Sequence, residues 1–145
     1  MNKVIKMVYR RLEELKDAIK RWLRGYHEYL VRIDLTIPAG TTLTLEFAPP
    51  ADEVWFKEDY KFKVDKLDVI KMSYYADGEV IFKDLLIGEN ELEMPNLGTL
   101  TVRNAVIVIE NTDTVDHTGS ILEKYLVIPK SEFDKLVREA EKEEV

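Results

Sequence analysis

Apolar side chains in the first 26 residues recur at a spacing that predicts an amphipathic helix. They follow one another at alternating steps of four and three positions from Met1 to Tyr26. A repeat of 3.5 residues is typical of a coiled-coil seam. Residues 2–24 contain no Pro or Gly, and Gly25 provides a stop for the helix. The predicted seam consists of Ile5, Val8, Leu12, Leu15, Ile19 and Trp22.

The width of this apolar face bears on what the helix packs against. Val8 occupies a d position of the heptad, where a β-branched residue disfavours a parallel dimer, and Val4 and Leu23 widen the face. We therefore expect a homo-oligomer, with a trimer favoured. Two alternatives stay open. The helix packs on its own β-domain as an ordinary amphipathic helix, or basic residues beside Trp22 and Tyr9 bring it to an anionic membrane surface.

Between Tyr29 and Pro129 the apolar period changes to two, which predicts β-strands. The odd-numbered residues from Tyr29 to Ile37 are apolar, and mostly polar residues stand between them. Residues 54–56 form a short apolar piece, and a longer alternating run begins at Tyr60. Further on, Asp77-Gly78 separates two β-rich runs, which is the strongest short-range signal for a hairpin.

The strands predicted in this way number about eight, at short spacing and with no helix between them. Parallel βαβ folds need such helices, so we expect antiparallel sheets. The predicted fold is therefore mainly β, an antiparallel eight-strand β-sandwich of jelly-roll-like type. A small closed barrel is the alternative.

A short helix is predicted after the last strand. Ser131 followed by Asp134 forms a capping-box arrangement, and Phe133 and Leu136 give the helix an apolar side. The tail that follows is acidic. The chain thus divides into an N-terminal basic heptad helix (1–26), a β-sandwich domain (29–130) and a C-terminal acidic helix (131–145).

Charge is divided unevenly along the chain. The formal net charge of -7 combines +5 over residues 1–24 with -12 over the remaining 121 residues. A basic arm of this kind can contact an anionic surface, or the acidic body of a neighbouring copy. We do not expect nucleic-acid binding as the main role, because the acidic domain would repel DNA.

Composition indicates a hot environment. Cys and Gln are both absent while Lys, Glu and Asp are abundant, which is typical of thermophilic proteins. Without Cys there is no disulfide, thiolate metal site or cysteine nucleophile. No apolar run reaches the roughly 18 residues that span a membrane, and charged residues interrupt the start where a secretory signal needs an apolar core. We expect a protein of the cytoplasm or of a virion.

Signals for catalysis are weak. The chain has three Ser and two His residues, with no Gly-x-Ser-x-Gly motif and no phosphate-binding loop. We therefore expect a protein that is not an enzyme and that carries no cofactor.

The strongest candidate for chemistry is the polar loop after the buried strand that ends near residue 109. Its metal-ligand candidates are Glu110, Asp113, Asp116 and His117. Carboxylate oxygens and an imidazole suit a cation, and the carboxylates alone would suit a small hydrolase. A plain connecting loop is the alternative, because Asn, Asp, Thr and Gly are common in hairpin connections.

Aromatic residues offer a second candidate site. Trp55 follows a Pro-Pro pair, and Tyr74 and Tyr75 precede the predicted hairpin turn. Together they would form a patch at the edge of the sandwich that stacks on a sugar or a peptide. The alternative is that one member of each pair is a core residue, because adjacent strand residues face opposite ways.

A basic heptad helix followed by an antiparallel sandwich resembles, in outline, the subunits of viral fibres, spikes and capsids. The stretch from Ile37 to Leu43 looks like the turn-and-strand openings of phage tail sandwiches. This resemblance implies a structural or adhesive role. We therefore expect a non-enzymatic assembly protein of a thermophile or its virus, oligomerising through the N-terminal helix. The alternative is a glycan- or peptide-binding β-sandwich module.

Overall fold

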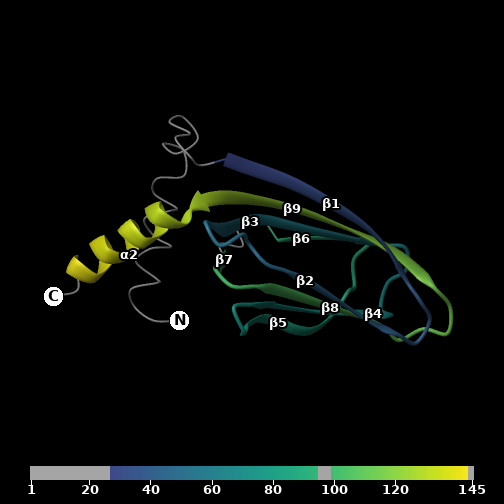
Figure 1. The fold of residues 1–145 in the computed structure, drawn as a ribbon. Helices are drawn as coiled ribbons and strands as arrows, with labels where there is room; N and C mark the ends of the chain where they lie inside the picture. The colour runs from purple at the N-terminus through teal and green to yellow at the C-terminus, as the bar shows by residue number, and fades with distance from the viewer. Residues whose placement is uncertain (1–26, 95–98, 144–145) are drawn as a thin grey trace.

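The computed structural model describes residues 27–94 and 99–143 (Figure 1). The helix predicted for residues 1–26, with its seam, lies outside the described residues. The described part forms nine strands and one helix, where the pattern predicts eight strands in this region. Their bounds are β1 His27–Ile37, β2 Thr42–Phe47, β3 Glu53–Val64, β4 Ile70–Ala76, β5 Glu79–Leu86, β6 Glu91–Met94, β7 Thr99–Thr101, β8 Ala105–Asn111, β9 His117–Pro129 and α2 Lys130–Glu143.

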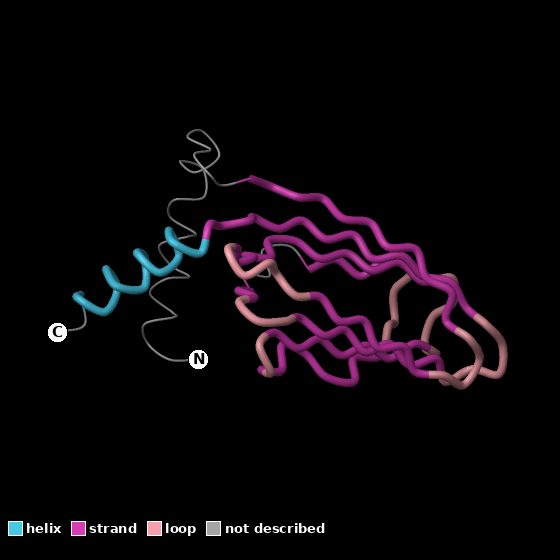
Figure 2. Tube along the Cα trace, viewed as in Figure 1, coloured by secondary structure: helices cyan, strands magenta, loops and turns pink. Residues whose placement is uncertain are grey.

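The strands lie in two layers (Figures 1 and 2). One sheet has the order β1-β9-β3-β6, with β7 also paired to β3, and the other has the order β2-β8-β4-β5. Every strand pair is antiparallel. The prediction of a mainly β, antiparallel fold is therefore confirmed. The closed-barrel alternative is wrong, because the two sheets stay separate and keep open edges. The chain crosses from one sheet to the other after β1, β2, β3, β5, β7 and β8.

The main core lies between the two sheets. Along β8 buried residues alternate with half-buried ones, because one face of the strand looks into the sandwich and the other looks outward. Both sheets contribute fully buried large side chains, such as Phe62 and Ile121 from one and Tyr74 and Ile107 from the other. Burial of this apolar surface is the main favourable term in folding, and it fixes which face of each strand is internal.

A β-bulge in β3 reverses the direction of its side chains. The register with β9 shifts between Lys57 and Asp59, which leaves one extra residue in β3. Before the bulge, Val54 and Phe56 face the outside of the sandwich, and after it Tyr60 faces the inside. The bulge explains why the sequence pattern separates residues 54–56 from the later run, although both belong to one strand.

The helix α2 covers a second core on the outer face of the five-stranded sheet. Phe133 and Ala140 lie one above the other on the helix and are buried against the cluster that includes Phe56 and Ile128. The backbone N–H of Lys130 donates to the carbonyl of Asp52 at 2.8 Å, which fixes the start of the helix. A helix after the last strand is therefore observed, beginning one residue before the predicted Ser131.

Candidate functional site

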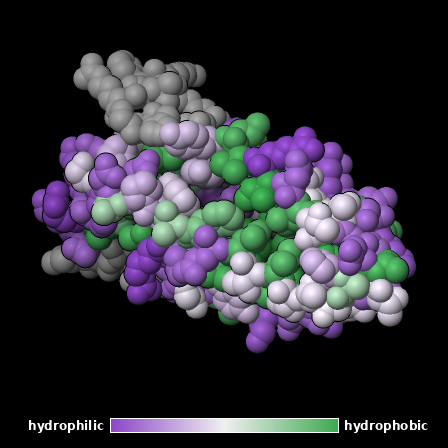
Figure 3. All heavy atoms as spheres, turned by 45° about the vertical axis from the view of Figure 1, so that its right-hand side comes forward, coloured by the Kyte–Doolittle hydropathy of each residue, from purple (hydrophilic) through white to green (hydrophobic). Residues whose placement is uncertain are grey.

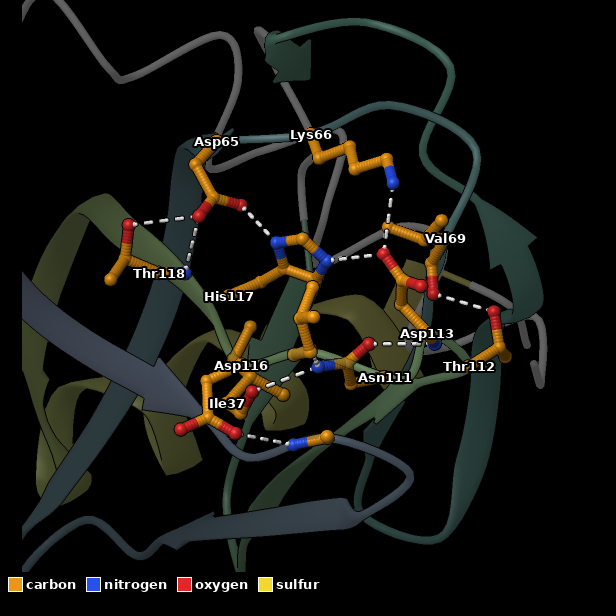
Figure 4. A network of polar contacts seen from close by, with 12 residues as sticks. Ile37, Asp65, Lys66, Val69, Asn111, Thr112, Asp113, Asp116, His117 and Thr118 are labelled. Carbon is orange, nitrogen blue, oxygen red and sulfur yellow. Dashed lines mark hydrogen bonds and ion pairs between the residues drawn. The ribbon is translucent and has the colours of Figure 1, made fainter.

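His117 lies at the start of β9, at the end of the sandwich where three loops meet (Figure 4). Its Nδ1 is 2.9 Å from Asp65 Oδ1, and its Nε2 is 2.8 Å from Asp113 Oδ2. The side chain of His117 is 5% exposed, that of Asp113 is 17% exposed and that of Asp65 is 40% exposed, so the contact with Asp113 is the better shielded from water. Each ring nitrogen of His117 lies within hydrogen-bond distance of a carboxylate oxygen, so neither nitrogen is left without a polar neighbour.

Asp113 collects the hydrogen bonds of this network. Besides His117, the Nζ of Lys66 lies 3.0 Å from Oδ2, and the backbone N–H of Thr114 donates to Oδ1 at 2.8 Å. The hydrogen bond from His117, followed by those from Lys66 and Thr114, holds the pKa of Asp113 well below its usual range. Asp113 therefore stays ionised at neutral pH and forms the anionic centre of the network.

Asn111 supplies a neutral frame beneath these charges. Its Nδ2 donates to the carbonyls of Ile37 and Val115, each at 2.9 Å, and its Oδ1 accepts from the N–H of Asp113 at 2.9 Å. Asparagine is 1% exposed here, and both ends of its amide are engaged. The network joins the loops that follow β1, β3 and β8. We call this set the loop clasp: Asp65, Lys66, Asn111, Asp113 and His117.

The four residues proposed as metal ligands do not converge on one point. Asp113 and His117 bind each other, whereas Asp116 turns to the loop after β1 and accepts from the N–H of Ala39 at 2.8 Å. Glu110 lies within β8. Across residues 27–94 and 99–143, no group of three or more His, Asp or Glu side chains is arranged to hold a metal ion. The polar groups of the loop clasp satisfy one another, which is what a structural tie requires.

The three aromatic residues proposed as a ligand patch lie apart. Tyr74 is fully buried in the sandwich core, and Tyr75 lies on the other face of β4. Trp55 belongs to β3 in the other sheet, where its ring centroid is 5.1 Å from that of Tyr125. Tyr125 in turn lies 5.8 Å from Tyr29. The structure thus removes Tyr74 from the surface and places Trp55 in a different aromatic group, Tyr29, Trp55 and Tyr125.

The sequence pattern does not predict the ion pair between Lys57 and Glu123. Their Nζ and Oε1 atoms lie 3.0 Å apart, with side chains 4% and 7% exposed, and Nζ sits 4.4 Å from the ring centroid of Tyr74. Alternation along β9 could have indicated that Glu123 is buried, because it lies on the same face as the core residue Ile121. Lys57 gave no such signal, because the bulge beside it breaks the alternation that would assign its face.

The described surface also carries exposed apolar area. Two grooves, of about 520 and 320 Å³, are lined mainly by β1, β3 and β9 of the five-stranded sheet. Large apolar side chains are exposed at Tyr29, Leu30, Leu67, Val80, Leu86 and Val115. Figure 3 shows apolar side chains gathered in a band across one face. In the described part of the chain, no helix is long and apolar enough to cross a membrane.

Comparison with known proteins finds likeness in fold only. No protein-family model and no curated protein sequence matches the chain. Among solved structures, the chain is similar to one from the Bacillus endospore appendages, described as disulfide-linked pili, at 16% identity and a TM-score of 0.48, covering 70% of this chain and 86% of that one. It is also similar to the major capsid protein P2 of bacteriophage PM2, at 13% identity and a TM-score of 0.45, covering 72% of this chain and 46% of that one. A de novo designed double-stranded β-helix matches at 15% identity and a TM-score of 0.37, covering 64% of this chain and 97% of that one. At these values the likenesses assign no function to this chain.

Proposed function

We propose that this chain is a non-enzymatic structural protein that assembles with copies of itself. The observation that carries the proposal is strand β1. It is an edge strand of 11 residues, paired with β9 along its whole length. Its other side has no strand partner among residues 27–94 and 99–143. A long sheet edge without such a partner is a template for pairing with another chain.

The apolar side chains of β1 support this role. Val31, Ile33 and Leu35 lie on one face of β1 and are half-buried, and Ile33 and Leu35 pack against the main core. Among residues 27–94 and 99–143, no strand covers them from the open side. Burying apolar surface favours association by roughly 25 cal/mol per Å². A strand added at this edge would complete the burial of these residues. This favours assembly as the function of the edge.

The state of the loop clasp also favours a structural role. His117 uses both ring nitrogens on carboxylates, and Asn111 uses both ends of its amide. A general base or a metal ligand needs an available lone pair. The contacts of these residues instead tie three loops together, as a building block with a rigid end requires.

We further infer that β6 and β7 act as two parts of one edge strand. Both pair antiparallel with β3, β7 at residues 55–57 and β6 at residues 60–63. Counted as one, they give an eight-strand jelly roll, an architecture found in viral capsids and lectins. A virion or surface-assembly component of a thermophile or its virus is the specific role that we propose.

The N-terminal segment enters the proposal as a second assembly element. The seam through Leu12 and Leu15 would form a helical trimer, and the +5 charge of residues 1–24 would contact an anionic surface or an acidic neighbour. The test is the absolute mass of the full chain with Leu15→Asp, against Arg10→Asp outside the seam as the control. The proposal expects a loss of mass for Leu15→Asp alone. Equal masses for both variants would show that the helix takes no part in assembly.

A glycan- or peptide-binding module is the second candidate, supported by the aromatic group of Tyr29, Trp55 and Tyr125. Tyr29 is 46% exposed, and rings at these spacings can present a stacking surface. Binding on a glycan or peptide array that Trp55→Ala abolishes and Tyr75→Ala retains would support it. Binding that survives Trp55→Ala in a folded protein would exclude this surface.

A further inference from the structure

We infer that two copies of this chain pair antiparallel through β1, in the register that places Ile33 of one copy opposite Ile33 of the other. The inference rests on the proposed function and specifies the contact. It would join two five-stranded sheets into one continuous sheet across a two-fold axis, which is the commonest symmetry of homo-oligomers. Three observations lead to it: the state of the four sheet edges, the faces of β1 and the charges that β1 carries.

The four edges of the two sheets differ in their suitability for pairing. β5 has two register shifts against β4, and within it Asp84 has a φ of 51°. β6 and β7 are four and three residues long, and β2 has six residues. β1 has 11 residues, contains no Pro or Gly, and follows β9 without a register shift. Natural proteins block edge pairing with short strands, bulges and Pro, and β1 has none of these.

The faces of β1 restrict the register. Residues directly opposite each other in an antiparallel pair lie on the same face of the sheet. Val31, Ile33 and Leu35 face the core side, and Arg32 and Asp34 face the outer side. A continuous sheet therefore requires core-side residues to meet core-side residues, so only every second register keeps both faces intact.

Charge separates the register centred on Ile33 from its two immediate neighbours. Centring the pair on Arg32 places two arginines opposite each other, and centring it on Asp34 places two aspartates opposite each other. Centring it on Ile33 places Arg32 of each copy opposite Asp34 of the other, twice in one interface. Opposite charges directly across a strand pair stabilise it, whereas like charges destabilise it. Registers displaced further toward residue 37 shorten the paired segment.

The monomer keeps both charges available for this exchange. Arg32 Nε and Asp34 Oδ1 form an exposed ion pair at 3.1 Å, with side chains 67% and 70% exposed. Such a pair is held only weakly, because water competes for both groups. In the dimer each group gains a cross-strand partner, and Val31 and Leu35 become mutual neighbours at the extended core.

The first experiment uses two variants of the full chain, Arg32→Asp and Asp34→Arg. Each variant alone would place like charges opposite each other at both sites. Mixed together, they would restore two opposite-charge pairs between unlike copies, while the ion pair within each copy stays broken. We expect the mixture to show about twice the mass of either variant alone by light scattering, since pairing joins two units. Equal masses before and after mixing would overturn the register.

The second experiment uses the absence of cysteine from the chain. In the inferred register, Ile33→Cys places two thiols opposite each other at a Cα separation of about 5 Å, within disulfide range. Val31→Cys is the matched control, because its two thiols would lie about 13 Å apart along the strands. We expect a disulfide-linked dimer from Ile33→Cys and a monomer on a non-reducing gel from Val31→Cys. Equal cross-linking of both variants, or none of Ile33→Cys, would overturn the inference.

These outcomes separate the inference from the proposed function. A full chain that is oligomeric by mass but gives no cross-link at position 33 would retain the assembly role and reject the β1 contact. A full chain that is monomeric at every concentration would reject both. Circular dichroism of each variant checks that the fold is kept before its result is read.

Discussion

Lys57 and Glu123 form an ion pair inside the sandwich, with Nζ and Oε1 3.0 Å apart and both side chains less than a tenth exposed. Removing two charges from water is costly, and their attraction offsets that cost only while both partners are present. The pair thus makes each residue dependent on the other. It also fixes the register of β3 against β9 next to the bulge, since a slipped strand would leave both charges unpaired.

We predict that Lys57→Met destabilises the fold by about 3–5 kcal/mol, because it leaves the Glu123 carboxylate buried and unpaired. The double variant Lys57→Met with Glu123→Leu should recover most of that loss. Denaturant unfolding measures both. The control is Asp134→Asn, which breaks the partly exposed pair with Lys130 and should cost less than about 1 kcal/mol. A single-variant loss as small as the control's would contradict the interpretation.

The loop clasp should make stability depend on acid. The pKa of Asp113 is lowered in the folded state, so its contribution is present above the unfolded pKa of about 3.9 and is lost as the pH falls toward the folded pKa. We predict that Asp113→Asn reduces stability at neutral pH and flattens the decline below about pH 4. Thermal unfolding across an acid pH series tests this. If stability falls with pH in parallel for the parent chain and for Asp113→Asn, Asp113 is not the source of the acid dependence.

Two buried tyrosines should respond differently to loss of the hydroxyl. The Tyr60 hydroxyl donates to Met72 Sδ at 3.1 Å, whereas the buried Tyr74 hydroxyl has no hydrogen-bond partner of good geometry within residues 27–94 and 99–143. Burial raises the pKa of both groups, which keeps them neutral. We predict that Tyr74→Phe leaves the free energy of unfolding unchanged or raises it by up to about 1 kcal/mol. Tyr60→Phe should lower it by about 1 kcal/mol. The reverse order in denaturant unfolding would contradict this assignment.

Gly119 should not tolerate a side chain. A Cβ there would lie 3.0 Å from the carbonyl oxygen of Lys63 and 3.2 Å from Cζ of Phe62, and the backbone oxygen cannot move without disturbing β3. We predict that Gly119→Ala costs about 1–3 kcal/mol. Gly88→Ala is the matched control. A Cβ at position 88 would lie 3.6 Å from Asp68 Oδ1, which is an ordinary contact, so this variant should leave stability nearly unchanged. Similar unfolding midpoints for the two variants would refute the steric argument.

Local patterns predicted the elements that depend on neighbours in sequence. Alternation marked β1, and Asp77-Gly78 marked the hairpin between β4 and β5, where φ is 51° at Asp77 and 81° at Gly78. Both features follow from strand pleating and turn geometry. The order of strands within the sheets could not be read in this way, because it is set by which faces meet in the core.

The loop clasp shows the same limit. Asp113 and His117 were visible as a polar cluster, but Asp65 and Lys66 come from a loop almost 50 residues earlier in the chain. Their meeting depends on β3 and β9 being neighbours in one sheet, which no local pattern states. The sequence therefore pointed to this loop, but it could not supply the partners that come from the loop after β3.

If this protein assembles with copies of itself, its mass in solution must exceed the mass of one chain. The most direct test is the absolute mass of the full chain in solution by light scattering, over a series of protein concentrations. We predict a mass that is a multiple of 16.9 kDa and that falls as the protein is diluted. A mass of 16.9 kDa at every concentration would contradict it.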